Sequence, residues 1–141
     1  LNFPISSVMA IEFNENLKDV DEEQSIFLDD FVSDLSKYLW TIRYELDLMS
    51  DIRLTETLQE IFRQVHSLKG ASQVFGRKDL ASMAHNLESH LANWQKNIRT
   101  VRVLHIEIIL GSYLSIFHSI LMELRSRQDF REFQSWRELS T

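Results

Sequence analysis

Residues that break helices are scarce in this chain, which contains only three glycines and one proline in 141 residues. Proline removes a backbone donor and glycine is a poor helix former, so their scarcity favours long uninterrupted helices over a turn-rich β fold. Apolar residues recur at helical spacing within these stretches. The clearest case is the seven-residue repeat of Leu28, Leu35, Ile42 and Met49, which is typical of the seam of a helical bundle.

The same periodicity predicts four long helices, at about 21–49, 55–74, 79–97 and 101–125, and a short last helix around Phe133. Asp21 is the expected N-cap of the first helix, and Gly76 is the expected glycine that ends the second. Helices with one apolar stripe and short connections bury that stripe most simply as an antiparallel bundle. We therefore predict an all-α four-helix bundle with a short additional C-terminal helix over residues 21–141, and a lead-in or linker segment over residues 1–20.

Charge and composition exclude several classes of function. The net charge is −6 and no tract is rich in lysine and arginine, so neither nucleic acid nor a membrane surface is an expected partner. The absence of cysteine excludes disulfides, thiol catalysis and cysteine-ligated zinc. No stretch is expected to span a membrane, and residues 1–20 lack the basic start of a signal peptide. We expect a cytoplasmic protein that is a monomer as an isolated domain.

The second predicted helix carries a polar group of residues beside its apolar stripe. His66 falls on the flank of the stripe, so its ring should reach solvent, and Lys69, Gly70 and Gln73 lie along the same flank. A glycine inside a helix costs about 1 kcal/mol relative to alanine. Gly70 therefore indicates a position that something approaches closely, although a helix-packing contact is the alternative.

A carboxylate on the third predicted helix should reach His66. Glu88 is twelve residues after Gly76 and His66 is ten before it, so the two face each other if the helices are antiparallel neighbours. A carboxylate that accepts the proton of Nδ1 fixes the tautomer of the ring and leaves Nε2 as a nucleophile toward phosphorus. An ammonium beside the ring, such as that of Lys69, would offset the charge of phosphoryl oxygens.

The pattern of His66, Lys69 and Gly70, followed by Gly76 and by His85-x-x-Glu88, resembles the signature of histidine phosphotransfer (HPt) domains. It is most similar to the N-terminal phosphotransfer domain of CheA-type chemotaxis histidine kinases of bacteria. The long first helix also resembles the opening helix of those domains, and the similarity covers about residues 22–125.

The resemblance implies a role for each matching residue. His66 is the phosphorylated residue, Lys69 stabilises the phosphoryl group, Glu88 hydrogen-bonds the ring, and His85 belongs to the same polar cluster. Gly70 leaves room for the partner, and we assign Gln73, on the same flank, to partner access as well.

The resemblance also implies partners and cofactors. HPt domains carry a phosphoryl group and do not catalyse its transfer. Phosphate would reach His66 from a histidine kinase catalytic domain, in cis or in trans, or from a receiver aspartate, and would pass to a response-regulator receiver domain. The Mg²⁺ and ATP belong to those partner domains, so no cofactor and no metal are expected on this chain.

Two other readings compete with a phosphoryl carrier. A di-iron bundle needs Glu-x-x-His pairs on two helices with further inward acids, whereas this chain has one pair in the reverse order. A non-phosphorylated helical-bundle adaptor or dimerisation module shares the fold and would not need His66. The remaining histidines are interpreted as structural or surface residues: His90, His105 and His118.

Overall fold

The computed structural model describes residues 22–139, with side chains from residue 27 onward. Its four helices are α2 (Glu22–Asp47), α3 (Leu54–Phe75), α4 (Lys78–Lys96) and α5 (Val103–Leu139), and this part of the chain contains no strand. The prediction of an all-α helical bundle is confirmed. The expected lead-in at residues 1–20 and the expected N-cap at Asp21 lie outside the described residues.

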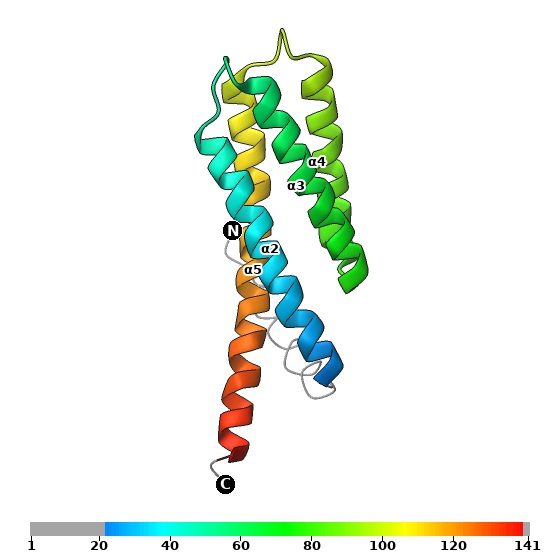
Figure 1. Ribbon diagram of the computed structural model, residues 1–141, viewed down its shortest axis with the longest axis vertical. Coiled ribbons are helices and arrows are strands. Elements are labelled where there is room, and N and C mark those ends of the chain that lie inside the picture. Colours follow the sequence, from blue (N-terminus) through cyan, green and yellow to red (C-terminus); the bar gives the residue numbers. More distant parts are fainter. Residues whose placement is uncertain (1–21, 140–141) are drawn as a thin grey trace.

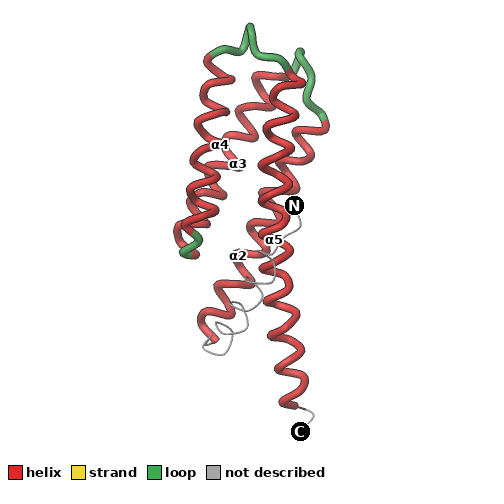
Figure 2. The backbone as a smooth tube through the Cα atoms, turned by 180° about the vertical axis from the view of Figure 1, so that it is seen from behind, coloured by secondary structure: helices red, strands yellow, loops and turns green. Residues whose placement is uncertain are grey.

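The helices run up and down with short connections (Figure 1). α3 packs between α2 and α4, and α5 packs mainly along α2. The two longer connections lie at one end of the bundle and the tight α3–α4 turn at the other (Figure 2). Gly76 makes that turn in the left-handed conformation, with φ of +88°, and its N–H bonds to the carbonyl of Ser72 at 3.0 Å. Residues with a side chain rarely adopt this conformation, which is why glycine ends α3 as predicted.

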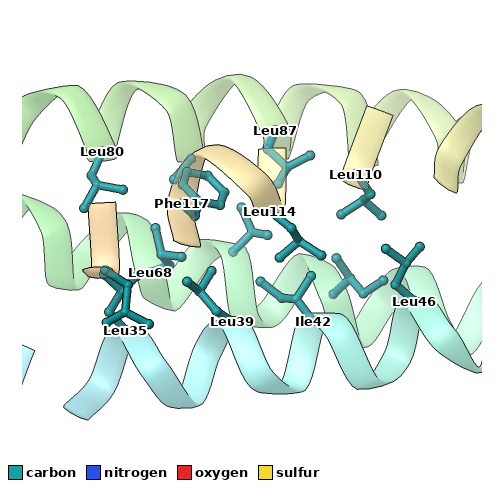
Figure 3. Close-up of a cluster of buried hydrophobic side chains, with 14 of the residues drawn as sticks. Leu35, Leu39, Ile42, Leu46, Leu68, Leu80, Leu87, Leu110, Leu114 and Phe117 are labelled. Carbon is teal, nitrogen blue, oxygen red and sulfur yellow. The ribbon is translucent and has the colours of Figure 1, made fainter. Parts of the chain in front are cut away.

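The core follows the apolar stripes read from the sequence. The seven-residue seam of α2 points inward, and Leu35 and Ile42 have no exposed surface. Phe117 of α5 is the largest fully buried side chain, and Figure 3 shows it among leucines of α2, α3 and α4. Because every helix contributes to one continuous cluster, the core holds α3 and α4 as neighbours along their length.

The last two predicted helices form a single helix. α5 runs without a break from Val103 to Leu139, and its C-terminal end extends past the α3–α4 turn (Figure 1). No glycine or proline separates the segment around Phe133 from the preceding helix, so nothing interrupts the backbone hydrogen bonds. Asp29 of α2 accepts a hydrogen bond from Gln128 at 2.9 Å, which ties the extension to α2.

One expectation about α5 is wrong. We expected no stretch long and apolar enough to cross a membrane, but α5 meets both criteria by length and composition alone. The same helix contributes seven buried residues to the core: Ile106, Leu110, Leu114, Phe117, Ile120, Leu121 and Leu124. The core helix of a globular bundle passes the same test as a membrane span, because both require long apolar runs.

Candidate functional site

The ring of His66 stands on α3 with 65% of its side-chain surface exposed, and a carboxylate of α4 holds one of its nitrogens. Nδ1 lies 3.2 Å from Oε2 of Glu88, whose own side chain is only 12% exposed. A carboxylate can only accept a hydrogen bond, so Nδ1 carries the proton in this pair. In the neutral tautomer of this pair, the other ring nitrogen, Nε2, has a free lone pair.

Glu88 also binds a cation from α3. Nζ of Lys69 lies 2.6 Å from Oε1 of Glu88, and the Lys69 side chain is 20% exposed. Burial disfavours the charged carboxylate, but hydrogen bonds from Lys69 and His66 outweigh it and hold the pKa of Glu88 below its usual value. Glu88 is therefore ionised at neutral pH and bridges the two α3 side chains. Sequence reasoning paired Glu88 with His66 but did not anticipate its ion pair with Lys69.

An aromatic residue of α3 lies close to the His66 ring. Phe62 lies nearly parallel to the imidazole, with ring centroids 6.4 Å apart and 7° between the planes. Sequence reasoning did not place Phe62 beside His66. Its position four residues before His66 was the available signal, because side chains at that spacing meet on one helix face.

The comparison with family models matches residues 26–117 to the Hpt domain, from α2 into the first half of α5. The chain belongs to the Hpt domain family. Its role is therefore phosphotransfer in two-component signalling, and kinases and response regulators are its kind of partner. No curated protein and no solved structure matched the chain.

Gly70 of this Hpt domain faces open space. A Cβ built at Gly70 meets no atom within 4 Å, so packing within the chain does not require glycine there. Gln73, one turn further along α3, is exposed. Both positions are free for a partner to approach, and their assignment to partner access stays a prediction.

Within the described part of the chain, the structure shows no bond between the ring of His85 and the other site residues. His85 is exposed on α4, and its backbone carbonyl accepts a hydrogen bond from Ser89 at 3.3 Å. No hydrogen bond or ion pair joins its ring to His66, Lys69 or Glu88 within the described residues. Its membership of the polar cluster stays a prediction without support from a contact.

The other histidines of the Hpt domain lie away from this site. His90 and His105 pack against the ring of Trp94, with centroids 5.6 and 6.3 Å away. His118 is exposed on α5. Among residues 22–139, no group of three or more His, Asp or Glu side chains could hold a metal ion.

Because Glu88 bridges His66 and Lys69, its contribution to the stability of the fold should depend on pH. Because the pKa of Glu88 is lowered in the folded state, its stabilising contribution is complete above its ordinary value of 4.5 and is lost as the pH falls through the lowered value. Glu88→Gln should therefore reduce the free energy of unfolding by about 1 kcal/mol at pH 7. The difference from wild type should shrink toward zero in acid, where the wild-type carboxyl is also neutral.

Chemical denaturation between pH 7 and pH 3 measures this difference. Glu132→Gln, at an exposed glutamate of α5, is the matched control and should show no such trend. A Glu88→Gln difference that is constant over this range would show that the carboxylate charge contributes nothing to folding.

Proposed function

We propose that this chain is a phosphoryl carrier in a two-component phosphorelay and that His66 is its phosphorylated residue. His66 accepts phosphate from the ATP site of a histidine kinase or from a receiver aspartate and passes it to a response-regulator aspartate. One observation carries the proposal: Nδ1 of an exposed imidazole lies 3.2 Å from Oε2 of ionised Glu88, and a hydrogen bond between them leaves Nε2 available. This is the arrangement that an imidazole nucleophile needs.

The transfer step follows from that geometry. The Nε2 lone pair attacks phosphorus, the bond from phosphorus to the leaving oxygen of ADP or of the aspartyl group breaks, and an Nε2–P bond forms. The proton on Nδ1 stays in the hydrogen bond to Glu88, whose negative charge stabilises the positive charge that develops on the ring. In the onward step a receiver carboxylate attacks phosphorus and the neutral ring leaves, so no net proton is taken up.

Lys69 supplies positive charge beside this reaction. It lies one turn after His66 on α3, and its ammonium already meets Oε1 of Glu88 at 2.6 Å. We propose that Lys69 also attracts the phosphoryl oxygens once Nε2 carries the group, as the resemblance implies. ATP and the Mg²⁺ that neutralises the transferring phosphate come from the partner domains, so the chain itself needs no cofactor.

The type of Hpt domain, its cellular location and its oligomeric state are proposed as well. We propose that this domain is of the CheA type and acts in the bacterial cytoplasm as a monomer. Its support is the motif that runs from His66 to Glu88 together with the 26-residue opening helix α2. An ATP-binding domain downstream in the full-length gene product would identify a kinase, and its absence would identify a separate shuttle. Gel filtration of the isolated domain tests the monomer.

Radiolabelled phosphate on the chain tests whether it is a phosphoryl carrier. The chain is mixed with radiolabelled ATP and each histidine kinase of the source organism, or with each phosphorylated receiver domain. We expect a label on the chain that is lost in acid and stable in alkali, as an N–P bond requires. Absence of label with every donor would leave the non-phosphorylated adaptor or dimerisation module as the better reading.

A further inference from the structure

The α3–α4 hairpin exposes one large apolar side chain. Val74, near the end of α3, is 85% exposed. Within the described residues, all other exposed large apolar side chains lie on α2, on α5 or in the loop after α2, and none lies on α4. A single exposed valine is ordinary on a protein surface, so its position decides whether it matters.

Val74 lies in line with the nucleophile. His66, Gly70 and Val74 follow each other at four-residue spacing on α3, and residues so spaced form a ridge on a helix surface. Val74 is about 12 Å from His66 along the helix axis, at 1.5 Å for each residue. Gly70 contributes no side chain between them, so the ridge has a notch with the imidazole on one side and the valine on the other.

Arg77, a charged residue near this ridge, is already paired within the chain. Arg77, which follows the turn, hydrogen-bonds Asp79 at 2.8 and 2.9 Å and reaches Glu123 of α5 at 3.5 Å. These contacts hold the pKa of Arg77 above its usual value and fix its side chain to the bundle. Its charge is thus largely balanced within the chain, and the ridge next to it offers an apolar contact instead.

A receiver domain must cover this ridge if it takes phosphate from His66. An aspartate side chain is short, so the receiver surface around it has to approach α3 closely, whereas the triphosphate of ATP extends its last phosphate away from the nucleotide site. An interface of about 800 Å² on each partner, centred on His66, has a radius of about 16 Å and includes Val74.

We propose that Val74 is the apolar contact by which a response-regulator receiver domain docks beside His66, with part of the receiver surface seated in the notch at Gly70. The inference rests on the proposed phosphorylation of His66 and adds a residue that the partner contacts. An apolar side chain that an interface removes from water adds to the binding energy roughly in proportion to the area it buries.

The test separates docking from chemistry. Wild type and Val74→Lys are first phosphorylated with phosphoramidate, a small donor that needs no docking surface, and the phosphate on His66 is quantified by mass spectrometry. Each phosphorylated chain is then mixed with the purified receiver domain that accepts phosphate fastest from wild type, loaded with Mg²⁺. Ile108→Lys is the matched control, because Ile108 is a β-branched residue of α5 with 62% exposure.

We expect equal labelling of all three chains and transfer about tenfold slower from Val74→Lys only, the change that 1.4 kcal/mol of lost docking energy produces. Transfer from Val74→Lys at the wild-type rate would overturn the inference and leave the function of His66 intact. In a parallel reaction with the kinase and ATP, slower phosphorylation of Val74→Lys with unchanged transfer to the receiver would also overturn it, because the contact would then belong to the kinase. Absence of label on His66 in wild type would overturn the proposed function and this inference with it.

Discussion

Replacing His66 with glutamine is expected to abolish phosphorylation of the chain by any kinase or receiver donor. The amide nitrogen of glutamine has no available lone pair, so it cannot form the bond to phosphorus. Because 65% of the His66 side chain is exposed, the free energy of unfolding should change by no more than about 0.5 kcal/mol. Measuring the acid-labile label together with a denaturation curve therefore distinguishes loss of the phosphorylated residue from loss of the fold.

Two further histidine variants serve as controls for this result. His118→Gln changes an exposed histidine of α5 and should keep the full label. His85→Gln should keep at least part of it, since no hydrogen bond or ion pair joins the His85 ring to His66 within the described residues. A label that survives His66→Gln would place the phosphorylated residue elsewhere in the chain.

Much of the fold could be predicted because it depends on local spacing. The repeat from Leu28 to Met49 and the lack of helix breakers require no knowledge of distant contacts, and α2 and α3 appear within a few residues of the expected ranges. The end of α5 was harder to predict. No glycine or proline breaks the helix after residue 125, but its extension is held on α2 by contacts such as Gln128 with Asp29, which join residues almost a hundred positions apart.

The site shows the same division between local and distant information. Counting from the turn at Gly76 placed Glu88 opposite His66, because antiparallel helices bring residues at similar distances from a turn together. The count could not decide which cation Glu88 would bind. Lys69 reaches Oε1 by a side-chain rotamer, and rotamers are not encoded in helical spacing. The pairing of the Arg77 side chain with Asp79 and Glu123 likewise depends on rotamers and on the packing of α5, which helical spacing does not encode.

The largest effect expected from a change outside the nucleophile is at Gly70. Gly70→Gln should raise the free energy of unfolding by about 0.5 kcal/mol, because glutamine is a better helix former than glycine and no atom lies within 4 Å of the new Cβ. Transfer to a receiver should nevertheless slow by about a hundredfold. The new side chain would fill the notch one turn from His66, and displacing reacting groups by 1 Å costs about that much in rate.

A second glycine provides the matched control. Gly111 also lies inside a helix with no atom within 4 Å of a Cβ, but on α5. Gly111→Gln should stabilise the chain by a similar amount and leave transfer unchanged. Comparing the two variants therefore separates the effect of the side chain's position on transfer from the effect of helix propensity on stability. Both variants are measured by denaturation. Both are also phosphorylated with phosphoramidate, and the rate at which phosphate passes from each chain to a receiver domain is then measured. If Gly70→Gln transfers as fast as Gly111→Gln, the partner does not approach through the notch, and the glycine at this position serves neither access nor packing.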